Sequence, residues 1–304
     1  MSASGHFLLD CDPGIDDAFA IFCALEFGNL DVVTTVSGNV SLDNTTRNAL
    51  YLLELAGADV AVHRGAARPL RVEPAFADEV HGSSGLGRHR TPEPTQTEQP
   101  TDAVEAILDY CADGGAVIVA TGPLTNIAAA LIADPTLADR VENLYWMGGG
   151  TTKGNVTELA EFNAWCDPDA AALTLESGIP LTMFDLDLTH QVRMGAAEIT
   201  RLEESGTATG DFFADALGFY QQSSPLGNQG QPMHDPCAVL GFLRSDNFRF
   251  RRSNIVCQTT EDERGRTVVD FSDEGGHRLA VAADERELIE LILKAITNPD
   301  GSDK

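Results

Sequence analysis

Four aspartates stand close together near the start of the chain. Asp10, Asp12, Asp16 and Asp17 fall within a stretch of eight residues, and carboxylates this close repel one another unless a cation lies among them. Such oxygen ligands favour a hard divalent cation, Ca²⁺ or Mg²⁺, over zinc. The alternative is that Asp16 or Asp17 only caps the next helix, which does not account for all four. The stretch therefore predicts a metal or substrate site.

Two later positions are candidates for contact with a ligand. Asn39 lies just after the β-branched run 31–37, which we expect to be a strand. An asparagine that only forms the turn after this strand explains its position equally well. His81 opens a glycine-rich stretch inside the irregular segment 64–100, and long loops in compact domains are usually functional or disordered. We interpret this stretch as a candidate flap over the site, with an exposed surface histidine as the alternative.

A second dense group of polar residues lies between Asn155 and Asn163. In an extended segment, Glu161 and Asn163 would point to one side and Phe162 to the other. A solvated polar loop explains the same spacing equally well.

The pair His234-Asp235 stands at the start of an apolar segment in the last third of the chain. Because proline follows, Asp235 is also a good helix N-cap, with Pro236 at the first helical position. In that interpretation His234 is an ordinary loop residue.

These polar groups need a scaffold, and the rest of the chain alternates strands with helices. We expect strands at 31–37, 58–62, 116–120, 141–147, 181–184 and 279–282, and helices at 42–56, 196–204, 211–222 and 285–296. Such alternation implies right-handed crossovers and an α/β fold with an open, mostly parallel central sheet and helices on both faces. A hairpin of residues 248–259 and 267–271 makes the sheet mixed. No repeat or boundary is evident, so we expect residues 1–304 to form a single domain.

The charge balance is strongly acidic, with 47 Asp and Glu against 20 Lys and Arg and a net charge of −27. Such a surface repels nucleic-acid phosphate, so DNA or RNA is not an expected partner. Lysine occurs only at Lys153, Lys294 and Lys304. Because the self-repulsion needs screening, we expect adaptation to a salt-rich cytoplasm, with an ordinary acidic protein as the alternative.

The cysteines and the hydropathy indicate a cytoplasmic protein. Six cysteines show neither paired zinc-type spacing nor a disulfide framework, and Cys11 is expected to face the core from a strand. No signal pattern and no apolar run of membrane-spanning length is found, so a membrane is not an expected partner.

Taken together, the motifs resemble those of the inosine-uridine-preferring nucleoside hydrolases. The resemblance begins with the D-x-D-P-G-x-D-D element from Asp10 to Asp17 and continues over most of the chain. It is carried further by the following segments: Ser37-Gly38-Asn39, His81-Gly82-Ser83-Ser84-Gly85-Leu86, Thr121-Gly122-Pro123-Leu124-Thr125-Asn126, Met147-Gly148-Gly149, Glu161-Phe162-Asn163, Asp187-Leu188-Thr189-His190 and His234-Asp235-Pro236.

The resemblance implies a Rossmann-like fold and an enzyme that hydrolyses the N-glycosidic bond of ribonucleosides. It also implies that the enzyme binds Ca²⁺. It implies calcium ligation by Asp12, Asp17, Asp235 and the main-chain carbonyl of Thr121. Asp12 would also be the general base, His234 the general acid, and Asp10 a support for the turn. The ribose would be held by Asp16, Asn39, Asn155, Glu161 and Asn163, with Met147 nearby. Relatives are usually homodimers or homotetramers.

The residues that read the base are not evident from the sequence. They are expected between Phe219 and Pro232, with Phe162 and His81 as further candidates for contact with the base. Two alternative functions compete with nucleoside hydrolysis. One is a Mg²⁺-dependent phosphatase that uses Asp10 as its nucleophile, with Lys153 as the nearest candidate cation for the phosphate. The other is a catalytically silent nucleoside-binding protein.

Overall fold

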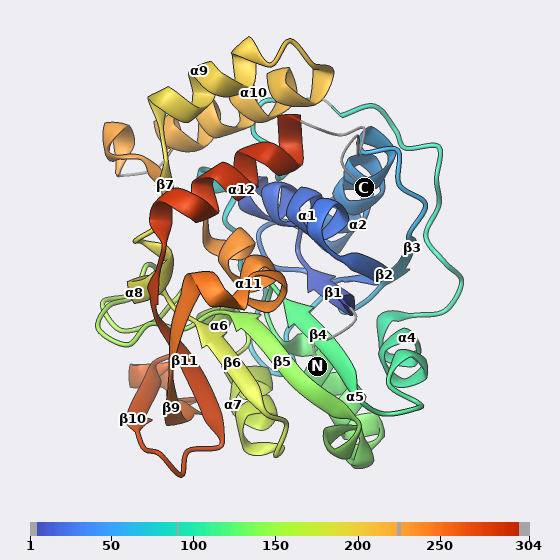
Figure 1. Ribbon diagram of the computed structural model, residues 1–304. Helices are drawn as coiled ribbons and strands as arrows, with labels where there is room; N and C mark the ends of the chain where they lie inside the picture. The colour runs from blue at the N-terminus through green and yellow to red at the C-terminus, as the bar shows by residue number, and fades with distance from the viewer. Residues whose placement is uncertain (1–4, 90, 224–225, 298–304) are drawn as a thin grey trace.

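Nine strands form one mixed sheet in the computed structural model, which describes residues 5–89, 91–223 and 226–297 (Figure 1). The strands follow the order β10-β9-β11-β6-β5-β4-β1-β2-β3. Their bounds are β1 His6–Cys11, β2 Asn29–Thr35, β3 Ala61–Arg64, β4 Ala116–Ala120, β5 Val141–Met147, β6 Leu181–Phe184, β9 Phe248–Cys257, β10 Thr267–Phe271 and β11 His277–Ala283. From β3 to β11 every neighbouring pair is parallel, whereas β9 pairs antiparallel with both β11 and β10.

Helices cover both faces of this sheet, as the sequence predicted (Figure 1). They are α1 Ile15–Phe27, α2 Leu42–Leu55, α3 Asp78–His81, α4 Ala103–Tyr110, α5 Thr125–Ala133, α6 Phe162–Cys166, α7 Pro168–Glu176, α8 Leu186–Thr189, α9 Ala196–Glu204, α10 Ala208–Ser223, α11 His234–Leu243 and α12 Glu285–Thr297. A two-stranded sheet pairs β7 (Arg193–Met194) with β8 (Gln231–Pro232). No helix in the described part of the chain is long and apolar enough to cross a membrane.

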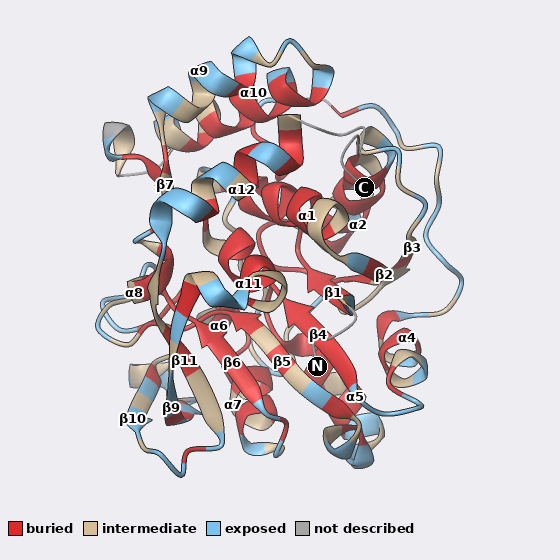
Figure 2. Cartoon of the chain, viewed as in Figure 1, coloured by how far each residue is buried: buried red, intermediate tan, exposed pale blue. Residues whose placement is uncertain are grey.

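The first strand shows why the sheet has two cores. Successive side chains of a strand point to opposite faces. Phe7, Leu9 and Cys11 therefore pack in one hydrophobic cluster with α1, α10, α11 and α12, while Leu8 packs in a second cluster with α5 and α7. All four side chains are fully buried, and strands β4 and β6 are buried throughout (Figure 2). Cys11 faces the core as predicted.

The predicted elements are present, with small shifts at several of their ends and two differences that need an explanation. The third strand begins at Ala61 rather than Ala58, because the amide of Ala58 still bonds to Leu53 at the end of α2. Residues 161–163 are not extended, because Glu161 caps helix α6 and Phe162 is its first residue. The predicted hairpin of β9 and β10 is confirmed.

Candidate active site

The strand order reverses direction between β1 and β4, which lie side by side although α1, β2, α2, β3, α3 and α4 separate them in sequence. Open α/β sheets bind ligands outside the carboxyl ends of their strands at such a switch point. Asp12 follows β1 and Thr121 follows β4 here. The topology therefore brings the aspartate-rich turn and the Thr121 carbonyl to the same edge of the sheet.

A cavity of about 680 Å³ lies at this edge. Its lining includes eleven of the residues singled out from the sequence: Asp16, Asn39, His81, Thr121, Met147, Asn155, Glu161, Phe162, Asn163, His234 and Asp235. Asp10, Asp12 and Asp17 do not line the cavity and are fully buried. The tertiary structure thus gathers residues that are spread over more than two hundred positions of the chain.

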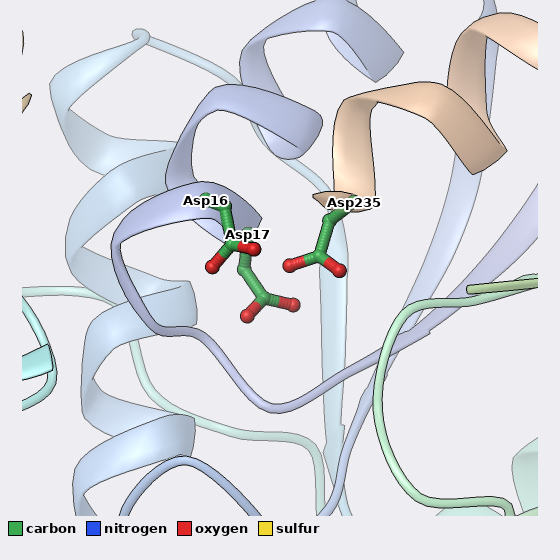
Figure 3. A group of neighbouring side chains, drawn as sticks. All are labelled: Asp16, Asp17 and Asp235. Carbon is green, nitrogen blue, oxygen red and sulfur yellow. The ribbon is translucent and has the colours of Figure 1, made fainter. Parts of the chain in front are cut away.

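Three carboxylates converge at the floor of this site. Asp16 and Asp17 come from the first turn of α1 and Asp235 from the start of α11, and their side chains point toward one another (Figure 3). One oxygen from each lies within 4.8 Å of the others. Burial and the charge of Asp17 raise the pKa of Asp16 to about 8, and burial raises the pKa of Asp235 well above its usual range. Such a cluster favours a bound cation.

The capping alternative for Asp17 is correct but incomplete. Its Oδ2 accepts hydrogen bonds from the amide of Gly14 (2.9 Å) and from Nδ2 of Asn39 (3.0 Å), and the first bond caps α1. Its Oδ1 accepts a bond from Oγ1 of Thr121 (2.8 Å). Asp17 therefore closes the helix and belongs to the carboxylate cluster at the same time. Asp235, by contrast, is not an N-cap, because α11 already begins at His234.

Asp12 lies close to this cluster but is not one of its three members. Its Oδ2 accepts a hydrogen bond from the amide of Asn39 (2.7 Å), while its buried Oδ1 has no hydrogen-bond partner. A Cβ at Gly38 would lie 2.0 Å from Oδ2, and one at Gly122 would lie 2.7 Å from Oδ1. Burial and the charge of Asp17 raise the pKa of Asp12 well above its usual range. Two glycines thus leave just enough room for this carboxylate.

Asp10 stands behind the turn, as expected. Its Oδ1 accepts bonds from Oγ1 of Thr34 (2.6 Å) and from Nδ2 of Asn126 (2.7 Å), and burial raises its pKa to about 7. Asn126 also donates to the carbonyl of Thr35 and accepts from the amide of Ala66 (2.8 Å). Asn126 therefore connects α5 to the ends of β1 and β2 through hydrogen bonds. Its position in the T-G-P-L-T-N motif did not predict this role.

The cap of α6 orients the second polar group. Glu161 accepts hydrogen bonds from the amides of Gly149 (2.8 Å), Asn163 (2.9 Å) and Ala164 (3.1 Å). Burial nevertheless raises the pKa of Glu161 to about 7. Asn163 donates from Nδ2 to the carbonyls of Thr121 (2.7 Å) and Met147 (3.0 Å), which joins α6 to the ends of β4 and β5.

The sequence analysis missed Trp165, which also lines the cavity. Trp165 is three residues after Phe162, so in a helix the two share one face. The signal was therefore available, but the expectation of an extended segment at 161–163 concealed it. Phe76, Val156, His190 and Tyr220 complete this apolar and aromatic side of the cavity.

Three histidines line the cavity: His81, His190 and His234. Burial lowers the pKa of His81 and His190 to about 4 and that of His234 to about 3, so all three are neutral at neutral pH. His81 Nδ1 accepts the amide of Ile15 (3.1 Å), which leaves the proton of its neutral ring on Nε2. His234 Nδ1 lies 2.7 Å from Oγ1 of the buried Thr189.

The donor set fits a hard divalent cation. The three clustered groups offer only carboxylate oxygens, and two buried oxygens nearby, Asp12 Oδ1 and Asp16 Oδ1, have no hydrogen-bond partner. A cation among them would neutralise the repulsion and satisfy these oxygens. No sulfur or imidazole group joins the cluster within the described residues, which disfavours zinc.

Comparisons with known proteins agree with this geometry. A family model described as inosine-uridine preferring nucleoside hydrolase matches residues 7–290. The chain is 40% identical over 273 residues to the pyrimidine-specific ribonucleoside hydrolase RihA of Shewanella woodyi, covering 86% of this chain and 87% of that relative.

Two solved structures extend the similarity to the whole fold. The purine-preferring ribonucleoside hydrolase from Gardnerella vaginalis matches with a TM-score of 0.92 and 31% identity, covering 97% of this chain and 98% of that one. The plant nucleoside hydrolase PpNRh1 matches with a TM-score of 0.91 and 31% identity, over 98% and 100% of the two chains. The chain therefore belongs to the inosine-uridine preferring nucleoside hydrolase family.

Proposed function

We propose that this protein hydrolyses the N-glycosidic bond of ribonucleosides, releasing ribose and the free base, with Ca²⁺ as its metal. The observation that carries the proposal is the carboxylate cluster of Asp16, Asp17 and Asp235 at the switch point of the sheet, opening into a cavity of about 680 Å³. Family membership supports this chemistry over that of the phosphatase, whose expected cation Lys153 does not line the cavity.

In this proposal Ca²⁺ is held by the carboxylates of Asp12, Asp17 and Asp235 and by the carbonyl of Thr121. When bound, the ion orients the attacking water and lowers its pKa, though less than zinc would. Asp12 is also the proposed general base, because a carboxylate that shares the metal with the attacking water lies where it can take the proton of that water.

The ribose hydroxyls would be bound by Asp16, Asn39, Asn155, Glu161 and Asn163, with Met147 against the sugar. Cleavage of the glycosidic bond builds positive charge on the ribose in an oxocarbenium-like transition state. Carboxylate and amide oxygens fixed around the sugar stabilise that charge, because they need no reorganisation during the reaction. The three backbone amides on Glu161 supply such fixation.

His234 is the proposed general acid toward the leaving base, and Thr189 is its positioning residue. If the Thr189 hydroxyl donates to Nδ1, the proton of the neutral ring resides on Nε2. His234 also lines the cavity, where its Nε2–H would donate a hydrogen bond to the leaving base as negative charge develops on that base. His81 and Phe162 are the proposed contacts with the base itself. Of the segment between Phe219 and Pro232, residues 224–225 lie outside the described part of the chain.

Three further properties complete the proposal. We infer a homodimer or homotetramer, a cytoplasmic location and adaptation to salt, the last from the net charge of −27. One relative is pyrimidine-specific by name and another is purine-preferring by name. The substrate panel must therefore include both classes of nucleoside.

The decisive assay measures reducing sugar released from inosine, adenosine, uridine and cytidine in molar NaCl. We expect turnover with Ca²⁺ and its loss with chelator. Nucleoside binding without ribose release would support the silent-binder alternative instead. Asp12→Ala should lose both turnover and metal affinity, and retained activity would refute the role of Asp12.

A further inference from the structure

A second cavity, of about 720 Å³, lies on the other side of the glycine-rich segment 82–89. Its lining residues are Arg47, Gly82, Ser83, Ser84, Gly87, Arg88, His89, Thr91 and Phe219. Two elements contribute to both cavities. His81 lines the active-site cavity, and the next residue, Gly82, lines the second cavity. Likewise, Tyr220 lines the active-site cavity, and the preceding residue, Phe219, lines the second cavity.

The charge of this second cavity is opposite to that of the molecule. The chain has 47 acidic residues, yet no Asp or Glu is among the described residues that line it, while Arg47, Arg88 and His89 are. In a strongly acidic protein, a pocket of basic and hydroxyl groups concentrates positive potential and favours an anion.

The arginines have spare capacity for hydrogen bonding. Arg47 donates to Oγ1 of Thr91 (3.2 Å) and to the exposed carboxylate of Glu93 (3.4 Å), while its buried Nε has no partner. Each guanidinium offers five N–H donors, and these two bonds use two of those on Arg47. Among the described residues it forms an ion pair only with Glu93, whose side chain is 82% exposed, and such pairs are weak.

The other basic side chains of the cavity come from the segment itself. Arg88 donates to Oε1 of Gln222 (2.7 Å) and lies 5.6 Å from the ring centre of Phe219. His89 Nε2 lies 3.4 Å from a carboxylate oxygen of the half-exposed Asp215. Phe219 adds an aromatic surface beside these groups, which suits the planar ring of a nucleobase.

We propose that this second cavity binds a phosphate monoester, with Arg47 and Arg88 on the phosphate and the hydroxyls of Ser83 and Thr91 as further donors. Arginine and hydroxyl donors are the groups that recognise phosphate oxygens. Inorganic phosphate and the 5′-phosphate of a nucleotide share this chemistry. The aromatic ring of Phe219 favours the nucleotide. The site is separate from the nucleoside site, whose substrate and products carry no phosphate.

The proposed ligand would contact two elements that also form the nucleoside site. It would bridge α2, the segment 82–89 and the end of α10. His81 immediately precedes this segment, and Tyr220 lies on α10. Binding that restrains these elements changes the affinity of the nucleoside site, and the coupling is reciprocal. We therefore expect the phosphate monoester to alter KM for nucleosides without competing for their site.

The test is calorimetric titration of the full chain with three probes: inorganic phosphate, ribose 5-phosphate and adenosine 5′-monophosphate, at constant ionic strength. We expect saturable binding, tightest for adenosine 5′-monophosphate. Arg47→Gln and Arg88→Gln should each weaken it about tenfold or more, since each removes a charge-assisted hydrogen bond. Arg68→Gln, which changes an exposed arginine outside the cavity, is the matched control.

Asp12→Ala separates this site from the nucleoside site and should leave the affinity for the probes unchanged. Equal affinity for all three probes would assign the site to phosphate alone and refute the role of Phe219. Absence of saturable binding, loss of binding in Asp12→Ala, or binding that Arg47→Gln and Arg88→Gln do not weaken would overturn the proposal.

Discussion

Replacing Asp235 by asparagine should have opposite effects on stability with and without metal. The carboxylate oxygens of Asp16, Asp17 and Asp235 lie within 4.8 Å of one another. Two unit charges at that distance repel by about 3.5 kcal/mol at an effective dielectric constant of about 20. Because burial raises the pKa of these groups, retained protons relieve part of that repulsion at neutral pH. The metal-free protein should therefore gain about 1–3 kcal/mol from Asp235→Asn.

In calcium the order reverses, because a carboxylate ligand is lost. Free Ca²⁺ at about one hundred times Kd stabilises the native state by about 2.7 kcal/mol. For a chain of this size 1 kcal/mol shifts Tm by about 2 °C. We thus expect Asp235→Asn to raise Tm by about 2–6 °C in chelator, whereas Ca²⁺ should raise Tm by about 5 °C only in the unmodified protein.

The assay is differential scanning calorimetry in molar NaCl, with chelator or with excess Ca²⁺. Asp109→Asn, an exposed carboxylate on α4, is the control and should follow the unmodified protein in both conditions. The reasoning is refuted if calcium stabilises Asp235→Asn as much as the unmodified chain. It is also refuted if the metal-free variant melts below the metal-free parent, because the cluster would then not be under repulsion.

Three further outcomes are expected. Thr189→Val should lower kcat for inosine about 10- to 100-fold, because general acid catalysis contributes a factor of about 10²–10⁴ to the rate. The kcat for p-nitrophenyl riboside should stay nearly unchanged, because its leaving group needs no proton. Equal losses of kcat for the two substrates would argue for a merely structural role of Thr189. Gly38→Ala should abolish ribose release, since its Cβ would lie 2.0 Å from the Asp12 carboxylate, whereas Gly276→Ala, with no atom within 4 Å, should be active. Dilution from molar to low salt should lower Tm because the surface charge is less screened; a flat or rising Tm would contradict salt adaptation.

Much of this protein was determined locally and was therefore accessible from the sequence. Strand–helix alternation follows from apolar periodicity, so the mixed sheet and most of its elements were predicted correctly. The D-x-D-P-G-x-D-D turn is also local, because one strand, one turn and one helix place all four carboxylates. Their separation by only a few residues made a metal or substrate site predictable without any tertiary contact.

Tertiary structure decided how those carboxylates are divided. Asp235 lies more than two hundred residues from Asp17, and only the packing of α11 beside α1 brings the two together. The environment of the Asp12 carboxylate depends on the Asn39 amide, which bonds to Oδ2, and on the space left by Gly38 and Gly122. The spacing of residues in the sequence does not predict these contacts.

The cap of α6 shows the same limit on a smaller scale. The polar spacing of residues 161–163 fits a strand or a loop, but amides from two elements converge on Glu161 and start a helix there. That helix turns Phe162 and Trp165 toward the cavity together. The sequence by itself indicated which side chains are candidates for the chemistry, since residue type is a local property. Their grouping required the fold, because the distances that govern charge repulsion and hydrogen bonding are set by contacts between distant segments.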